Sequence, residues 1–180
     1  MPVPAERERA VRQDTTSTSP VRRAAIRVLA GAGLLLVVLE AFLIVSFRLR
    51  LRPAINAIRR FNRAVLNPAM LTMAGSAHWY ASVIHHQGRT TGRTYATPVV
   101  AERVGDQFYI PLPYGRTDWC ANVTAAGECT VEHKGRRYRT TAPAVIGFAV
   151  AAPFISARSR RTFRLYKVRS FLRLDITDKA

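Results

Sequence analysis

The sequence is poor in residues that bind metals or form disulfides. Its two cysteines, Cys120 and Cys129, are nine positions apart, which fits neither a C-x-x-C redox pair nor a zinc cluster. The four histidines form no H-E-x-x-H motif, so no metal site is expected. We expect two free thiols in a reducing compartment, with a disulfide as the lesser alternative.

Acidic residues are also scarce. The 180 residues include 11 Asp and Glu against 28 Lys and Arg, which gives a net charge of +17. This excess predicts an anionic partner, such as a membrane surface, a polyanionic ligand or nucleic acid. Nucleic acid is the weakest of the three, because neither a helix-turn-helix nor an aromatic and basic platform is visible, and we expect no such partner.

The two common nucleotide-binding motifs are absent, since the sequence has neither G-x-x-x-x-G-K-[ST] nor G-x-G-x-x-G. In their place stands HQGRTTGRTYATP at residues 86–98. Its two glycines have access to positive φ and leave backbone N–H groups free, while its threonines and arginines bind phosphate or carboxylate oxygens. The stretch predicts an anion-binding turn, and a solvated hairpin turn is the alternative. The residues in question are Gly88, Arg89, Thr90, Thr91, Gly92, Arg93 and Thr94.

The first quarter of the chain changes composition twice. Residues 1–23 contain prolines, the run TTSTS and mixed charge, which predicts a disordered tail. Residues 24–47 are apolar, with Glu40 as the one charge between Val28 and Phe47. Twenty residues at about 1.5 Å each span a bilayer core of roughly 30 Å, so we expect a single transmembrane anchor, with a buried core helix as the alternative. More arginines follow the segment than precede it, which favours a cytoplasmic domain at the cell membrane.

Residues 48–74 combine arginines with apolar residues at helical spacing, which predicts a basic amphipathic linker helix that lies on anionic lipid or packs on the edge of the domain. Its arginines are expected to face lipid. Residues 75–180 predict a small antiparallel β-barrel, with one helix over Asp118–Ala125 capped by Thr117. The apolar segment VIGFAVAAPFISA, residues 145–157, predicts a pocket lid or a buried helix. The expected strands are Trp79–His86, Tyr95–Arg103, Phe108–Leu112, Cys129–His133, Tyr138–Val145 and Phe171–Ile176.

Four sequence pieces stand in a fixed order within residues 76–145. They are a G-R-x-[ST]-G loop at Gly88–Gly92, a T-P pair at Thr97 and Pro98, a glycine-containing loop at Tyr114–Arg116, and W-x-x-N at Trp119 and Asn122. Together they resemble the deazaflavin (coenzyme F-420)-dependent nitroreductase family. The resemblance implies a mainly β fold with helices, a split β-barrel of the FMN-binding-like type, and a deazaflavin coenzyme with an anionic phosphodiester and oligoglutamate tail.

The resemblance also implies the binding residues. The first loop would hold the phosphate and tail through Gly88, Arg89, Thr90, Thr91, Gly92 and Arg93. The deazaflavin ring would lie against Thr97, Pro98, Val99 and Val100, covered by Tyr114, Gly115 and Arg116, with Trp119 and Asn122 at its edge. Thr90 stands where the family often has lysine, and Tyr114 where a basic residue is common, so FMN stays the alternative cofactor.

The implied function is hydride transfer from the reduced coenzyme to an electron-poor acceptor. We expect the acceptor to be lipophilic, such as a quinone or nitro compound, because the membrane anchor and the segment 145–157 would place the pocket beside lipid. The candidate proton donors are Tyr109, Tyr114 and solvent, and no residue stands out as a general acid. His85 and His86 lie on one strand, so one is expected to face the core and the other solvent or ligand. The alternative function is a non-catalytic membrane-tethered module that binds deazaflavin, FMN or anionic lipid. A homodimer is compatible with either function.

Overall fold

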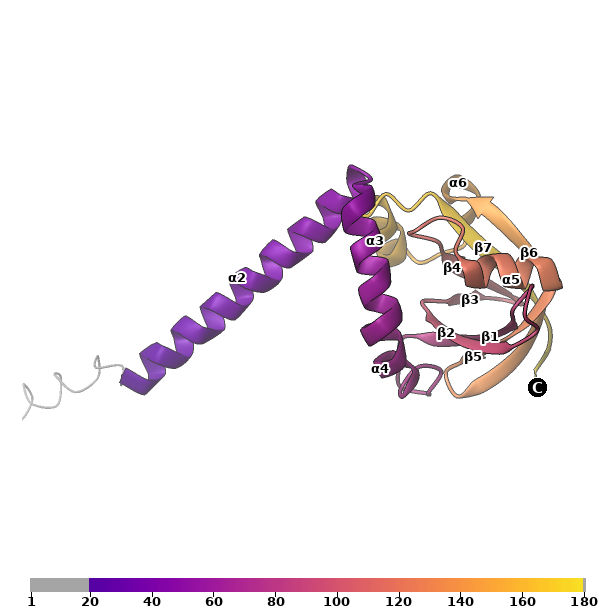
Figure 1. Ribbon diagram of the computed structural model, residues 1–180, viewed down its shortest axis with the longest axis horizontal. Helices are drawn as coiled ribbons and strands as arrows, with labels where there is room; N and C mark the ends of the chain where they lie inside the picture. The colour runs from indigo at the N-terminus through magenta and orange to yellow at the C-terminus, as the bar shows by residue number, and fades with distance from the viewer. Residues whose placement is uncertain (1–19, 180) are drawn as a thin grey trace, which may run out of the picture. The chain divides into compact units, whose positions relative to one another are not determined.

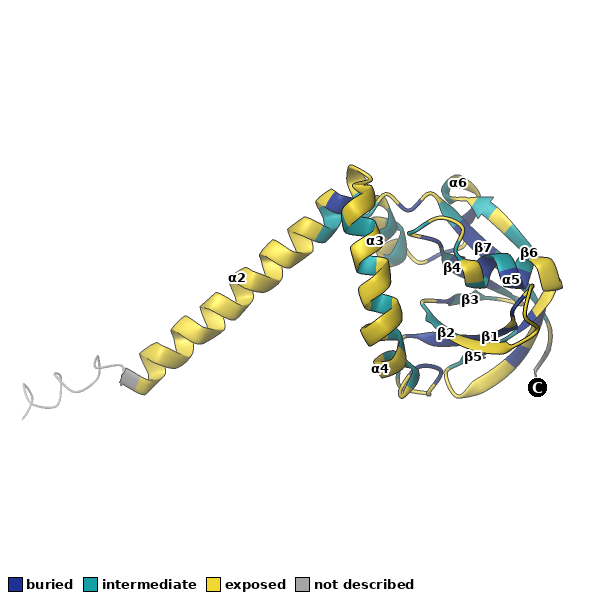
Figure 2. Ribbon diagram, viewed as in Figure 1, coloured by how far each residue is buried: buried dark blue, intermediate teal, exposed yellow. Residues whose placement is uncertain are grey.

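The computed structural model describes residues 20–179. Its first element is the helix α2 (Pro20–Arg48), so the helix begins inside the segment predicted as a tail, and the rest of that prediction, residues 1–19, lies outside the described residues. The chain divides into two compact units between Leu43 and Ile44. The large apolar side chains of α2 are exposed over most of its length (Figure 2), and α2 is long and apolar enough to cross a membrane.

Three short helical elements follow, and we call residues 52–71 the arm. They are α3 (Arg52–Phe61), the π-helical turn η1 (Asn62–Leu66) and α4 (Asn67–Leu71). Pro53 lies in the first turn of α3, where its missing N–H costs nothing. Pro68 has no N–H for the carbonyl of Ala64 and its ring crowds that carbonyl, so the wider turn before it relieves the clash. The predicted single helix over 48–74 is therefore an interrupted one.

The rest of the second unit is a single antiparallel sheet of seven strands in the order β2-β1-β5-β6-β7-β4-β3 (Figure 1). One helix, α5 (Asp118–Ala126), follows β4, and two more, α6 (Phe148–Ala151) and α7 (Ala157–Leu165), separate β6 from β7. The strands are β1 (Ser82–Gln87), β2 (Thr94–Val99), β3 (Glu102–Val104), β4 (Gln107–Pro111), β5 (Glu128–His133), β6 (Arg136–Gly147) and β7 (Ser170–Lys179).

The sheet curls because its two edge strands are neighbours in sequence. Only Val100 and Ala101 separate β2 from β3, and three Cα steps span at most about 11 Å. In a flat sheet of seven strands the two edges would be about 29 Å apart. The sheet therefore bends round into a half-barrel, and the predicted strand Tyr95–Arg103 is broken at residues 100–101, where the chain crosses from one edge to the other.

Alternate residues of the central strands face two different clusters. Phe108 and Ile110 of β4 pack with the inner side of α5 in the main core, whereas Tyr109 between them points to the opposite face. That second face is covered by α6 and α7 around Phe171, which is fully buried. The apolar segment 145–157 supplies the end of β6, α6 and the turn before α7, and it packs on this second cluster.

Both cysteines are free thiols and buried. The Cys129 Sγ lies 3.1 Å from the Thr140 Oγ1, and burial raises the pKa of the Cys129 thiol to about 11. Burial also raises the pKa of the Cys120 thiol.

We expect both thiols of the native chain to react slowly with iodoacetamide at pH 8, because the thiolate is the reactive form and burial disfavours it in both cysteines. The alkylation rate should rise as pH approaches 11 for Cys129, whereas in denaturant both thiols should react readily at pH 8. Mass spectrometry of each cysteine peptide after timed quenching measures this, and rapid native alkylation of Cys129 at pH 8 would contradict the burial described.

Candidate functional site

The second unit contains a cavity of about 600 Å³ between the arm, the β1–β2 hairpin and α5. Nine of the residues predicted from the sequence line it, so segments more than 30 positions apart in the chain meet there. These nine are Gly88, Arg89, Thr90, Thr91, Thr97, Pro98, Tyr114, Trp119 and Asn122.

The other six predicted residues do not line the cavity. Gly92 and Arg93 lie at the exposed end of the β1–β2 turn, and Gly115 and Arg116 lie in the exposed loop after Tyr114. Val99 packs against the main core, and Val100 is 46% exposed. The structure thus brings together the first half of the turn, the T-P pair and the W-x-x-N helix, but not the whole of the predicted set.

The turn needs its two glycines for different reasons. Gly92 has a φ of 65°, in the left-handed region that favours glycine. Gly88 was also expected to exploit positive φ, but it does not, and its constraint is space. A Cβ on Gly88 would lie 2.7 Å from the Thr91 Oγ1 and 2.9 Å from the Tyr95 Cε2. Two backbone hydrogen bonds close the turn, one from the Gly88 N–H to the Arg93 oxygen and one from the Gly92 N–H to the Gly88 oxygen, both 2.8 Å long.

Asn122 of α5 ties the turn to the helix. Its Oδ1 accepts hydrogen bonds from the Arg89 backbone N–H at 3.3 Å and from the Arg89 Nη1 at 2.8 Å. The same guanidinium lies 3.7 Å from the carboxylate of Asp118, in the first turn of α5. Asn122 is therefore a bridge between helix and turn, and Arg89 is held with its backbone and side chain both fixed.

The orientation of Asn122 determines the tautomer of His86. Because the Oδ1 faces two donors of Arg89, the Nδ2 faces His86 and donates to its Nδ1 at 3.3 Å. The imidazole proton is then on Nε2, which lies 3.2 Å from the Thr97 Oγ1. Burial, and next the charge of His85, lowers the pKa of His86, so the ring is neutral near pH 7.

Sequence reasoning assigned no role to His86, because it could not choose between two adjacent histidines. The structure buries His86, which stacks on Tyr95 with ring centroids 5.7 Å apart, while the His85 Nε2 lies 3.3 Å from the Glu132 carboxylate. The alternation expected for a strand is thus present. Choosing between the two required knowing that Asn122 of α5 contacts His86 of β1.

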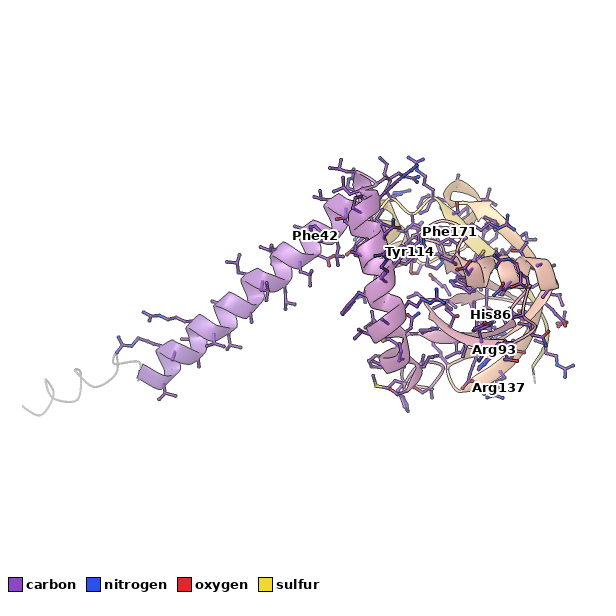
Figure 3. The ribbon with its side chains drawn as sticks, in the orientation of Figure 1. Phe42, His86, Arg93, Tyr114, Arg137 and Phe171 are labelled. Atoms are coloured by element: carbon purple, nitrogen blue, oxygen red, sulfur yellow. The ribbon has the colours of Figure 1, made fainter. Side chains whose placement is uncertain are left out.

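The two candidate proton donors lie in different places. Tyr114 lines the cavity beside α3 (Figure 3), and its hydroxyl accepts a 2.7 Å hydrogen bond from the Asn62 Nδ2. Burial raises the pKa of the Tyr114 phenol. Tyr109 does not line the cavity, because it lies on the other face of β4, where its hydroxyl donates to the Gln107 Oε1.

Thr117 does not cap α5 as the sequence predicted, and its hydroxyl bears on whether the cavity suits a ligand. It stands at the N-cap position of α5, but its side chain makes no capping bond. Its Oγ1 is buried without a hydrogen-bond partner among the described residues, and Thr117 lines the cavity. A buried hydroxyl without a partner costs free energy, so a polar group of a bound ligand would complete it.

The arm supplies lining residues that the sequence did not predict. The arginines of residues 48–74 were expected to face lipid, yet Arg59 and Arg63 line the cavity, with Asn62, Asn67, Pro68 and Leu71. The segment 145–157, proposed as a pocket lid, lines no part of it and packs on the Phe171 cluster instead. The lining carries three arginines and a single carboxylate, Asp118, which suits an anionic ligand.

Comparison with known proteins gives one family match. The model described as "F420H(2)-dependent quinone reductase" matches residues 70–169, more than half of the chain. The match agrees with the resemblance drawn from the four sequence pieces. A search of curated proteins found no match.

Two solved structures are similar to parts of the chain. One, titled "F420 Reductase", has 9% sequence identity and a TM-score of 0.41, and the match covers 61% of this chain and 94% of that one. The other, titled "domain-swapped dimer", has 9% identity and a TM-score of 0.45, over 68% of this chain and 99% of that one.

The lowered pKa of His86 makes the fold sensitive to acid. An unfolded histidine takes up a proton near pH 6.5, but the folded His86 does so only at lower pH, so the unfolded state binds more protons below pH 6.5. The free energy of unfolding should therefore fall as pH drops below 6.5, by at most about 1.4 kcal/mol per pH unit for one histidine. Burial also lowers the pKa of His133, which adds to this slope.

The substitution His86→Gln keeps hydrogen-bonding atoms but removes the titratable imidazole, so the dependence of the free energy of unfolding on pH between pH 7 and pH 5 should become less steep. His133→Gln is the matched control for the remainder. Chemical denaturation of the detergent-solubilised chain, repeated over this pH range, measures the slope. An unchanged slope in His86→Gln would mean that His86 titrates as it does in the unfolded chain.

Proposed function

Because the chain belongs to the family of quinone reductases that depend on the reduced deazaflavin coenzyme F-420, we propose that it transfers a hydride from this coenzyme to a lipophilic quinone. The cofactor is coenzyme F-420, and the chain is an oxidoreductase of this class. The observation that carries the proposal is the cavity in which the turn, the T-P pair and the W-x-x-N helix meet.

The residues of this cavity fit the two halves of the coenzyme. Arg89, Thr90 and Thr91 offer guanidinium and hydroxyl donors to a phosphodiester. Pro98 and Trp119 offer apolar surface to a flat ring, and the unpartnered Thr117 hydroxyl is available to a polar edge. The Asn122 bridge holds Arg89 in place before a ligand arrives, which reduces the entropy lost on binding.

When bound, the reduced deazaflavin supplies a hydride from its C5 position. The chain then has to orient the ring and the acceptor, exclude water and deliver a proton. Tyr114 is our candidate for the last task, because the Asn62 Nδ2 donates to its oxygen and leaves its own O–H proton free to point into the cavity. The raised pKa keeps that proton on the phenol at neutral pH.

The acceptor is proposed to be a quinone, in line with the family. Residues 145–157 do not support a lipophilic acceptor, because this segment packs on the Phe171 cluster and does not line the cavity. What supports a lipophilic acceptor is α2, which is long and apolar enough to carry the chain to a membrane. We propose that α2 is a single-pass anchor and that the second unit faces the cytoplasm, as the arginine-rich flank of α2 favours.

The proposed reaction is tested by mixing the detergent-solubilised chain with reduced coenzyme F-420 and a benzoquinone under anaerobic conditions, and following the ring absorbance. We expect oxidation of the coenzyme that depends on both the chain and the quinone. Arg89→Ala should weaken coenzyme binding at least about tenfold, because a charged hydrogen bond is lost. Arg93→Ala removes the same charge from the same turn but outside the cavity lining, and should change binding less than twofold.

Equal losses in the two variants would mean that the turn attracts the coenzyme by net charge alone. Tight binding with no oxidation by any quinone or nitro compound would favour a non-catalytic carrier of the coenzyme. Binding of FMN in preference to coenzyme F-420 would overturn the cofactor assignment.

The anchor is tested separately. After expression of the full chain, washing the membranes with alkaline carbonate should leave the protein in the membrane pellet, because an inserted helix resists the removal of peripheral proteins. Replacing Leu35 and Val38 by arginine places two charges in the middle of the apolar segment and should release the chain into the wash. Full release of the unaltered chain would rule out a spanning helix.

A further inference from the structure

Arg59 and Arg63 line the cavity without carboxylate partners. No Asp or Glu of the described residues lies within ion-pair distance of either guanidinium, although Arg89 across the cavity is paired with Asp118. The chain has few acidic residues, but it does pair Arg137 and Arg173 with carboxylates elsewhere. Two positive charges without a carboxylate partner on one wall of a cavity favour the binding of an anionic ligand there.

The arm is shaped to present a continuous face to the cavity. Its lining residues include Arg59, Arg63, Asn67 and Leu71, which are spaced four apart. In a regular α-helix each step of four residues rotates the side chain by about 40°, so residue 71 would point about 120° away from residue 59. The π-helical turn η1 lies in the middle of this stretch, and its wider i to i+5 turn rotates less per residue. The turn therefore returns Asn67 and Leu71 to the side of the two arginines.

The arm is also held to the rest of the unit at the cavity itself. None of the residues of α3, η1 and α4 is fully buried, although Met70 and Leu71 of α4 pack against the cluster of Ala74, Ala81 and Val83. Asn62, between the two arginines, donates its 2.7 Å hydrogen bond to Tyr114, and the ring of Tyr114 lies 5.6 Å from that of Phe47. These contacts place the arginines opposite the β1–β2 turn, about 6 Å apart along the helix axis.

We propose that Arg59 and Arg63 form a second anionic subsite, which binds the carboxylates of the coenzyme's oligoglutamate tail while the turn binds its phosphodiester. This inference rests on the proposed function, since it takes the same coenzyme as the ligand. It makes the arm, the segment that joins α2 to the sheet, one wall of the cofactor site. The chemistry recognised is a chain of carboxylates, for which two guanidiniums one helical turn apart are suited.

The experiment compares two ligands and four proteins. The ligands are coenzyme F-420 with its glutamates and the deazaflavin riboside, which has the same ring but neither the phosphodiester nor the tail. The proteins are the full chain in neutral detergent and its variants Arg59→Gln, Arg63→Gln and Arg60→Gln. Arg60 is exposed on the same arm but does not line the cavity, so it is the matched control for charge. Dissociation constants are measured by ligand fluorescence, with no turnover involved.

Arg59→Gln and Arg63→Gln should each weaken binding of the full coenzyme by about tenfold and leave binding of the riboside within twofold of the unaltered chain. Arg60→Gln should leave both within twofold. The loss in the first two variants should shrink as salt is raised, since screening weakens the contacts that they remove.

Equal losses for the two ligands would overturn the inference, because the arginines would then act on the ring or on the fold and not on the tail. So would unchanged binding in both variants of a chain that binds the coenzyme tightly. If the unaltered chain binds neither ligand, the proposed function fails first and the subsite with it. Phosphatidylglycerol added to the micelles should not displace the coenzyme, and strong displacement would assign the two arginines to a lipid phosphate.

Discussion

The two-residue link between β2 and β3 is the constraint on which the second unit depends. Because residues 100 and 101 must connect the two edges of a seven-stranded sheet, the sheet has to curl, and its inner face then closes over α5 and the main core. Strand β2, at one edge of this sheet, is in contact with α4 of the arm. The cavity lies in the space left between this edge, the arm and the start of α5. Without the link, the first half of the β1–β2 turn and the W-x-x-N helix would have no reason to meet.

Inside that space, a single amide organises the polar groups. Asn122 has one acceptor and one donor end, and Arg89 occupies the acceptor end with two hydrogen bonds. The amide nitrogen of Asn122 then donates to the Nδ1 of His86, which must therefore be unprotonated. The ring proton is on Nε2, which faces the Thr97 hydroxyl. Arg89 and Thr97 of the T-P pair are thus linked through two side chains, Asn122 and His86. A protonated His86 would place a second donor against Asn122, so the neutral state that burial favours is also the state that keeps Arg89 fixed.

Much of this organisation follows from the sequence, and the missing part has identifiable causes. The period-two pattern predicted the central strands within a few residues, and the same pattern explains why Tyr109 faces away from Phe108 and Ile110. The family resemblance, which rests on the order of four sequence pieces, named nine of the residues that line the cavity. The position of His86 opposite Asn122 could not be predicted, since it depends on a contact between residues 36 positions apart. The arm could not be assigned either, because an amphipathic pattern fixes which residues share a face but not what that face meets.

The arm is where electrostatics and backbone geometry act together. The arginines of α3 and η1 repel one another, and these two elements gain little free energy from packing because none of their residues is buried. The contacts of the arm with the rest of the unit include the hydrogen bond from Asn62 to Tyr114 and the packing of Met70 and Leu71 on the cluster of Ala74, Ala81 and Val83. An anionic ligand between Arg63 and Arg89 would add attraction on both walls and so stabilise the closed arrangement. The proposed subsite would therefore couple cofactor binding to the position of the arm through the same charges.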